Sequence, residues 1–225
     1  MMGICAFYHR EDPEEGILNR KTLGLVRVTL FSVWSKDLGR TWSAPAVVTP
    51  PLASPGWEAS HCPLELGDGT LAVPLSTWRG WDGDLPCGEQ AIVMFSDDRG
   101  RTWPRHARAF DGTKTGFIHW EQCVVEWQQG LLAIAWQYDP VKSQTHPTVY
   151  AVGQGRPLSF GPDRPTGFLA QTSEMIALDS TGVLCVYRRL DQPGLWANVA
   201  QVTGGSWVNE EAVPLWQGGP SDLAR

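Results

Sequence analysis

The chain has 225 residues, of which 42% are hydrophobic and 10% aromatic, so it is long enough and apolar enough to bury a sizeable core. Its formal net charge of -6 argues against nucleic acid or an anionic membrane surface as a general partner, although a local arginine cluster could still bind a small anion. No apolar run reaches the roughly 20 residues of a membrane-spanning helix, and no basic and apolar leader precedes Gly3. The 12 tryptophans, 24 glycines and 17 prolines are typical of aromatic strands separated by turns, and they predict an all-β protein.

The first predicted strand covers 3–10, and the next apolar run, 26–34, leads into the octapeptide Ser-Lys-Asp-Leu-Gly-Arg-Thr-Trp at 35–42. A further apolar run at 91–95 leads into Ser-Asp-Asp-Arg-Gly-Arg-Thr-Trp at 96–103. Both copies read Ser-x-Asp-x-Gly-x-Thr-Trp, and the second begins 61 residues after the first. This spacing is the length of a four-stranded repeat unit, so the copies indicate a repeated sheet.

The octapeptide has the chemistry of a hairpin turn between two outer strands. Its aspartate can accept hydrogen bonds from turn amides, its glycine can take a positive φ, and its tryptophan can pack back over the sheet. We therefore expect a structural role for these aspartates and tryptophans, which are Asp37, Asp97, Asp98, Trp42 and Trp103.

Between and after these copies, a strand, a tight glycine turn and a second strand recur at 60–75, 121–136 and 172–188. The segment 3–10 aligns with 182–189, the second strand of the last repeat, so the first repeat lacks its inner strand. Degenerate outer hairpins are expected at 152–158 and 203–207. The predicted organisation is one partial domain, 1–225, with blades at about 1–52, 53–115, 116–168 and 169–217 and the start of another at 218–225.

The five cysteines lie mostly within apolar runs, and their number is odd. Small buried hydrophobic side chains explain them better than a disulfide framework does, and only Cys87, in the loop 80–88, is expected to be exposed. Without a CxxC or HxxxH spacing, we expect no metal site, and we predict no cofactor. Reduced cysteines favour a cytoplasmic location, although localisation stays open.

The octapeptide resembles the Asp-box, or bacterial neuraminidase repeat, of the sialidase-like β-propellers. The resemblance implies an all-β, sialidase-like β-propeller, with about four blades present of about six. A closed four-bladed ring is the alternative, in which the terminal segment supplies the first blade's missing inner strand and removes an exposed sheet edge.

In such blades the glycine turns and the Asp-boxes lie on one rim, so the starts of inner strands and the ends of second strands meet at the other. Polar residues gather at that second rim, including the equivalent Tyr8 and Tyr187. Arginine suits a carboxylate, aromatic rings suit the face of a sugar, and carboxyl groups suit proton transfer. We predict a catalytic set of Glu121, Glu174, His61 and Tyr138, and a substrate-binding set of Arg10, Arg79, Arg188, Glu58, Trp78 and Asp139. Each also has a plainer interpretation as a solvated charge or a packing side chain.

Sialidases, as the resemblance implies, release a terminal sialic acid with three arginines, a tyrosine nucleophile assisted by a glutamate, and an aspartate acid/base. The Arg-Ile-Pro motif of that family is absent here, so the predicted site residues rest on their position at the rim. The predicted function is an exo-glycoside hydrolase acting on a terminal anionic sugar of glycoconjugates, with a carbohydrate as its partner and neither nucleic acid nor a membrane. A non-catalytic glycan- or protein-binding propeller, another glycosidase and a polysaccharide lyase are the alternatives.

Overall fold

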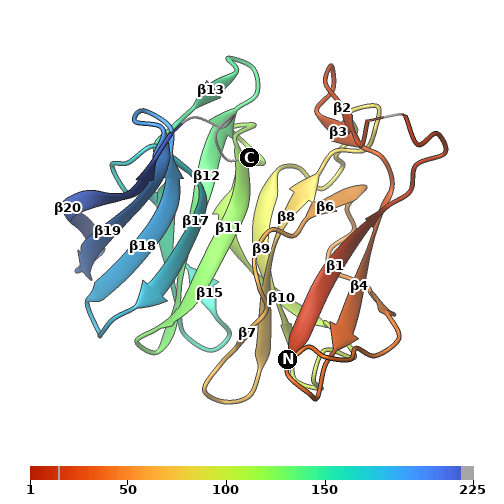
Figure 1. Ribbon diagram of the computed structural model, residues 1–225, viewed down its shortest axis with the longest axis horizontal. Coiled ribbons are helices and arrows are strands. Elements are labelled where there is room, and N and C mark those ends of the chain that lie inside the picture. The colour runs from red at the N-terminus through yellow and green to blue at the C-terminus, as the bar shows by residue number, and fades with distance from the viewer. Residues whose placement is uncertain (15, 219–225) are drawn as a thin grey trace. The chain divides into compact units, whose positions relative to one another are not determined.

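The computed structural model describes residues 1–14 and 16–218, and this part of the chain contains strands and turns without a helix. Accordingly, the described residues include no helix with the length and apolar character needed to cross a membrane. The all-β prediction is confirmed. The chain divides into two compact units, Met1–Gly116 and Phe117–Arg225 (Figure 1).

The first unit contains three sheets. One has the order β1-β4-β5 and consists of β1 (Met2–Tyr8), β4 (Val28–Trp34) and β5 (Ala46–Val48). Another has the order β10-β9-β8-β6, with β7 also paired to β8, and consists of β6 (Gly56–Glu58), β7 (Leu64–Glu65), β8 (Leu71–Trp78), β9 (Gln90–Ser96) and β10 (Arg105–Asp111). The third is a short hairpin of β2 (Leu18–Asn19) and β3 (Gly24–Leu25). Strand β1 is at the edge of its sheet, as expected for a first repeat without an inner strand.

The second unit contains two sheets. One has the order β11-β12-β14-β15, with β13 paired to β12 and β16 to β14, and consists of β11 (Ile118–Trp127), β12 (Gly130–Asp139), β13 (Gln144–Thr145), β14 (Val149–Gln154), β15 (Ser159–Phe160) and β16 (Arg164–Pro165). The other has the order β17-β18-β19-β20 and consists of β17 (Ala170–Ala177), β18 (Gly182–Arg189), β19 (Gly194–Thr203) and β20 (Ser206–Gln217). The first strands of these sheets, β11 and β17, pack against each other, as the inner strands of successive propeller blades do.

The number and boundaries of the blades stay predictions. The expected start of a further blade at 218–225, and with it the ring-closing strand, lies outside the described residues apart from Gly218. The predicted outer hairpins are present, because β14 turns into β15 and β19 turns into β20.

Each unit has its own apolar core, built from the central strands of its sheets. In the first unit, Val73 of β8 packs with Ile92 and Met94 of β9, and all three are inaccessible to solvent. In the second unit, Leu132 of β12 and Val183 of β18 are equally buried. Such near-continuous burial explains why these strands read as unbroken apolar runs in the sequence.

The first octapeptide forms a turn that its own side chains hold together. The Asp37 carboxylate accepts hydrogen bonds from the backbone N–H of Thr41 at 2.9 Å and from the Thr41 hydroxyl at 2.6 Å. The Ser35 hydroxyl donates to the same carboxylate and accepts from the backbone N–H of Gly39, whose φ is +86°. These bonds explain the spacing of the serine, aspartate, glycine and threonine without any ligand.

The second octapeptide repeats this network. Asp98 accepts from the Thr102 backbone N–H at 2.9 Å and from the Thr102 hydroxyl at 2.7 Å, while the Ser96 hydroxyl accepts from Gly100 at 2.8 Å. The structural role expected for both turn aspartates is therefore confirmed. Asp97, beside them, pairs instead with Arg105.

Acid should weaken the second turn, because its aspartate stabilises the fold only as a carboxylate. The hydrogen bonds from Thr102, first from its backbone and then from its hydroxyl, lower the pKa of Asp98 from 3.8 to about 2. This contribution is complete above pH 3.8 and is lost as the pH falls toward about 2. We expect urea unfolding to show a smaller loss of stability over this range in Asp98→Asn than in the wild type. Asp163→Asn, at an exposed position outside the turn, should keep the wild-type pH dependence.

The cysteines are all free, but their exposure differs from the prediction. Cys5 and Cys62 are exposed, Cys87 is half-buried, and Cys123 and Cys185 are buried. The prediction that Cys87 alone is exposed is therefore wrong. Cys5 lies on an edge strand, so an apolar run in the sequence does not guarantee burial there.

Candidate functional site

The register of the strands shows which end of each sheet carries the polar residues. In the first sheet, Tyr8 pairs with Val28, whereas Met2, at the opposite end of β1, pairs with Trp34 directly before the first octapeptide turn. In the neighbouring sheet, Trp78 pairs with Gly56, and the second turn follows the other end of β8 and β9. The predicted separation of octapeptide turns and polar strand ends holds in both sheets.

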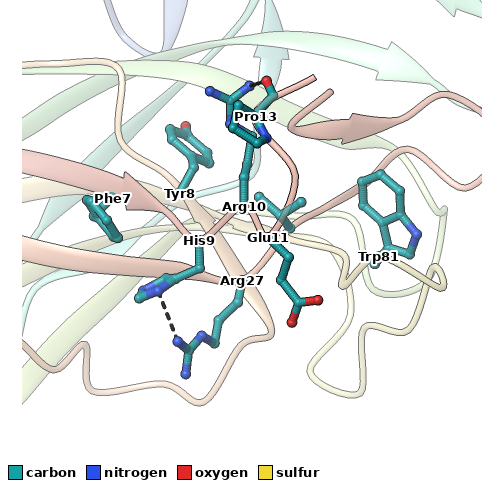
Figure 2. A pocket seen from close by; sticks show the side chains of 9 residues that line it. Phe7, Tyr8, His9, Arg10, Glu11, Pro13, Arg27 and Trp81 are labelled. Atoms are coloured by element: carbon teal, nitrogen blue, oxygen red, sulfur yellow. Dashed lines mark hydrogen bonds between the residues drawn. The ribbon is translucent and has the colours of Figure 1, made fainter. Parts of the chain in front are cut away.

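A cleft of about 960 Å³ opens at the end of β1 (Figure 2). Its lining comes from the end of β1 and the loop after it, from the segment between β3 and β4, and from the loop after β8. The lining residues are Phe7, Tyr8, His9, Arg10, Glu11, Pro13, Val26, Arg27 and Trp81. The volume is in the range of ligand-binding pockets, which is about 300–1,000 Å³.

Tyr8 is the tyrosine that lines this cleft, and the charge of the Glu58 carboxylate affects the pKa of its phenol. Burial raises the pKa of Tyr8 above its ordinary value of 10.0, and the negative charge of Glu58 on β6 raises it further. The phenol therefore keeps its proton at neutral pH. Glu58, which the sequence places in the substrate-binding set, is thus the carboxylate whose charge is felt by the phenol of Tyr8.

The side chain of Arg27 is hydrogen-bonded to an uncharged imidazole, that of His9. Its Nη2 donates to Nδ1 of His9 at 2.9 Å, and its backbone carbonyl accepts from the His9 N–H, also at 2.9 Å (Figure 2). A guanidinium can only donate, so Nδ1 is unprotonated and Nε2 carries the hydrogen, which it donates to Oγ1 of Thr29 at 2.8 Å. The edge of the His9 ring also packs on Phe7, with the ring centroids 4.8 Å apart. Arg27 is thus placed without neutralisation of its charge, unlike an arginine paired with a carboxylate.

Two of the predicted binding residues next to the cleft have structural partners. Nε of Arg79 donates to Oε1 of buried Glu89 at 2.7 Å. Burial raises the pKa of Glu89, and its hydrogen bond with Arg79 offsets only part of this effect. The Trp78 indole N–H donates to the carbonyl of Leu23 at 2.6 Å, which ties β8 to the β2–β3 hairpin. The third predicted residue of this region, Arg10, lies in the cleft and donates to the carbonyl of Pro13 at 2.9 Å.

The β2–β3 hairpin supports one wall of the cleft. Asn19 Nδ2 and the Thr22 hydroxyl both donate to the backbone carbonyl of Trp81, at 3.0 and 2.7 Å. The Leu25 N–H also donates to the Arg79 carbonyl at 3.0 Å. The β2–β3 hairpin therefore positions the loop that carries Trp81.

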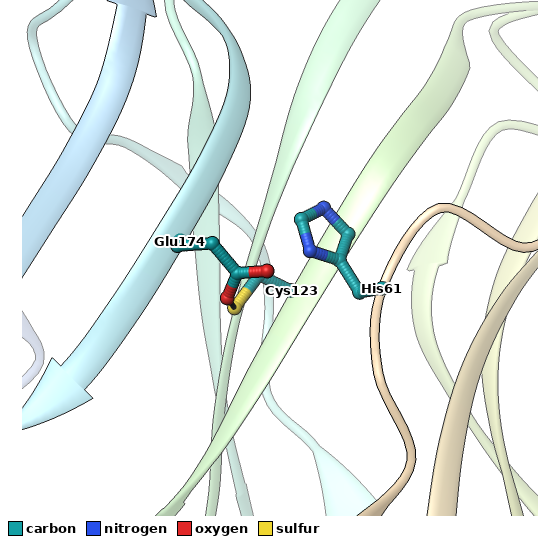
Figure 3. A group of neighbouring side chains, drawn as sticks. All are labelled: His61, Cys123 and Glu174. Carbon is teal, nitrogen blue, oxygen red and sulfur yellow. Dashed lines mark hydrogen bonds between the residues drawn. The ribbon is translucent and has the colours of Figure 1, made fainter. Parts of the chain in front are cut away.

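Glu121 and Glu174, predicted to be catalytic, both lie in the second unit. The Glu121 carboxylate accepts from the backbone N–H and the hydroxyl of Thr172, so it joins β11 to β17. Glu121 and Thr172 have positive φ values of 52° and 50°, and each lies at an irregularity in the register of its strand. Glu174 accepts a hydrogen bond from the Cys123 thiol at 3.4 Å (Figure 3). Burial and the Glu174 charge raise the pKa of Cys123 far above its ordinary value, so this thiol is unreactive.

The remaining residues of the predicted set are placed as follows. Tyr138 stacks on Trp120, with their ring centroids 5.9 Å apart at 17°. Asp139 accepts from the backbone N–H groups after it, those of Lys142 and Val141, and these bonds lower its pKa. Arg188 Nη2 donates to the Gln171 side chain. His61 is a buried residue of the first unit.

The structure thus divides the predicted residues between the two units. Of those in the first unit, Arg10 lines the cleft and Glu58 acts on its phenol through its charge. Sequence reasoning did not single out Arg27 or Trp81 for the site. Arg27 is a charged residue at the start of an apolar run, which is the one feature that could have drawn attention to it.

Comparison with known proteins shows which solved structures have a similar fold. No protein-family model and no curated protein matches the chain. A protein of unknown function from Dyadobacter fermentans matches 98% of this chain at a TM-score of 0.69 and 16% identity, and the match covers 63% of that protein. The Hadza microbial sialidase Hz136 matches 97% at a TM-score of 0.67 and 18% identity, covering 43% of the sialidase. A thermostable family-43 glycoside hydrolase matches 87% at a TM-score of 0.55 and 15% identity, covering 70% of that enzyme.

The fold resembles that of propeller-type glycosidases. At these identities the likeness concerns the fold alone. The chain spans less than two thirds of the length of the Dyadobacter protein and of the sialidase.

Proposed function

We propose that this chain carries an active-site cleft of an exo-acting glycoside hydrolase that removes a terminal anionic sugar, sialic acid or a related sugar acid, from a glycoconjugate. The observation that carries the proposal is a cleft that brings together the phenol of Tyr8, the guanidinium of Arg27 and the carboxyl group of Glu11, with the charge of Glu58 acting on the phenol from β6. The glycosidase-type fold is consistent with this chemistry.

A phenol suits attack on a sugar whose anomeric carbon bears a carboxylate, because a carboxylate nucleophile would be repelled by that charge. In the proposed reaction, Glu58 accepts the Tyr8 proton while the phenolic oxygen attacks the anomeric carbon. Glu11, which lines the same cleft, is the candidate acid that protonates the departing oxygen. Water then hydrolyses the glycosyl-tyrosine, so the configuration of the sugar is retained.

Arg27 is the proposed partner of the sugar carboxylate. A guanidinium can present two parallel N–H groups to a carboxylate, and Arg27 meets its protein partner through an uncharged imidazole. Arg79 is less suited to this role, because its Nε is already bonded to Glu89.

The proposal is tested by assaying the chain against fluorogenic α-sialosides and β-glucuronides. We expect hydrolysis of at least one of the two, and we expect Arg27→Gln to reduce kcat/KM about tenfold, mainly through KM, because a charge-assisted contact is lost. Arg101→Gln removes the same charge from the exposed turn at 96–103 and should leave both constants unchanged. Absence of hydrolysis for both substrates would contradict the proposed activity, and equal constants for Arg27→Gln and the wild type would contradict the role of Arg27.

A non-catalytic glycan-binding propeller is the second candidate. It is favoured by the hydrogen bonds of Glu121 with Thr172 and of Glu174 with Cys123, which give structural partners to the two carboxylates that the sequence predicts to be catalytic. Saturable binding of a sialylated or uronic-acid glycan without turnover would support this function over hydrolysis.

A further inference from the structure

The cleft is larger than one sugar needs. Its volume of about 960 Å³ lies at the upper end of the range of about 300–1,000 Å³ over which pockets enclose whole drug-sized ligands. A single pyranose ring is smaller than such ligands. The end of the cleft occupied by Tyr8 and Arg27 therefore leaves room for a second ring.

Trp81 lies across the cleft from Phe7 and Tyr8 (Figure 2). Its backbone carbonyl accepts two side-chain hydrogen bonds, from Asn19 and Thr22, so the main chain of the loop at Trp81 is held by two contacts from the β2–β3 hairpin. Trp81 is half-buried, so part of the residue is accessible to a ligand in the cleft. Its indole offers a large apolar face.

Other tryptophans of the first unit have different surroundings. The Trp78 indole is bonded to Leu23, and Trp57 and Trp103 are buried in the core. Trp42 is partly exposed, but it belongs to the octapeptide turn at the far end of its sheet and its indole donates to Gly39. Trp81 is the tryptophan that lines the cleft.

We propose that Trp81 is an aromatic platform for a second, neutral pyranose ring, so that the cleft recognises the terminal acidic sugar together with the sugar to which it is linked. The C–H groups on one face of a pyranose pack on the negative face of the indole, and the sugar hydroxyls stay in water. The assignment of Trp81 to the second ring rests on the proposed function, which gives the first ring to Tyr8 and Arg27. The binding of a neutral sugar by Trp81 does not require catalysis.

Calorimetric titration with lactose, N-acetyllactosamine and maltose tests the platform directly. We expect at least one of these neutral sugars to bind, and Trp81→Ala to weaken its binding about tenfold through loss of the aromatic contact. Trp81→Phe retains a flat ring and should recover most of the affinity. Trp42→Ala removes a tryptophan from outside the cleft and should bind as the wild type does. Thermal unfolding of each variant shows that the comparison is made between folded proteins.

Steady-state kinetics then test whether Trp81 binds the sugar next to the one that is cleaved. For 3′-sialyllactose, Trp81→Ala should reduce kcat/KM about tenfold, whereas for methyl α-sialoside, which has no second sugar, it should leave kcat/KM unchanged. If neither sialoside is cleaved but neutral-sugar binding depends on Trp81, the proposed hydrolysis fails and the platform stands. The platform is overturned if none of the three neutral sugars binds the wild type, or if Trp81→Ala binds them as tightly.

Discussion

Replacing Tyr8 by phenylalanine should reduce kcat/KM for an acidic glycoside by about a thousandfold or more, because the variant removes only the oxygen that attacks the sugar. The Tyr8 ring is half-buried in the cleft, and phenylalanine keeps its shape, so the fold and the KM should change little. Steady-state kinetics give both constants, and thermal unfolding gives the stability.

Two further variants show whether this loss is specific to the cleft. Glu58→Gln removes the carboxylate that acts on the phenol and should also cause a large fall in kcat, as expected for the group that accepts the phenolic proton. Tyr138→Phe is the matched control, because Tyr138 stacks on Trp120 in the second unit and was predicted from sequence to be catalytic. A large loss of activity in Tyr138→Phe together with retained activity in Tyr8→Phe would show that the reaction takes place outside the cleft.

Replacing Gly24 by alanine should detach the β2–β3 hairpin from the loop that carries Trp81. A Cβ atom at this position would overlap the backbone carbonyl oxygen of Gly80, which has no rotamer through which to move away. We expect the free energy of unfolding to fall by about 1–3 kcal/mol, as for other overpacked sites, with weaker binding of the neutral sugars. Urea unfolding and calorimetric titration measure the two effects.

Gly16→Ala is the control for this substitution within the same segment. Among the described residues, a Cβ at Gly16 would come near the Leu18 carbonyl oxygen, at 3.8 Å, which is an ordinary contact. Its stability and sugar binding should match those of the wild type. If Gly24→Ala also matched the wild type, the hairpin would not support the Trp81 wall.

The parts of the fold that could be predicted from sequence are those whose interactions are local. In the octapeptide turns, the hydrogen bonds of Asp37 and Asp98 reach groups within four residues, so the sequence contains the whole arrangement. The glycine turns between paired strands are equally local, and they were predicted at the right places. The strands β8 and β12 contain the apolar runs 71–75 and 131–136, as expected where both faces of a strand are buried.

The candidate site could not be predicted to the same extent, because long-range contacts build it. Thr22 is 59 positions from Trp81 in the chain, so the sequence around either residue does not indicate their contact. In the second unit, the register shifts next to Glu121 and Glu174 change which side chains share a face, and simple alternation along a strand does not anticipate them. The rim argument therefore separated the polar strand ends from the octapeptide turns in the two sheets of the first unit, but it did not anticipate the partners of the individual residues.

Covalent trapping at Tyr8 tests the proposed site most directly. A sialic acid derivative with fluorine at C3 and a fluoride leaving group should form a glycosyl-enzyme that hydrolyses slowly, because fluorine next to the reacting carbon destabilises its positive transition state. Peptide mass spectrometry of the trapped protein should find the sugar on the peptide that contains Tyr8, and Tyr8→Phe should remain unlabelled. Labelling of Tyr138 or another residue, or turnover of the acidic glycoside by Tyr8→Phe at the wild-type rate, would contradict the proposed site.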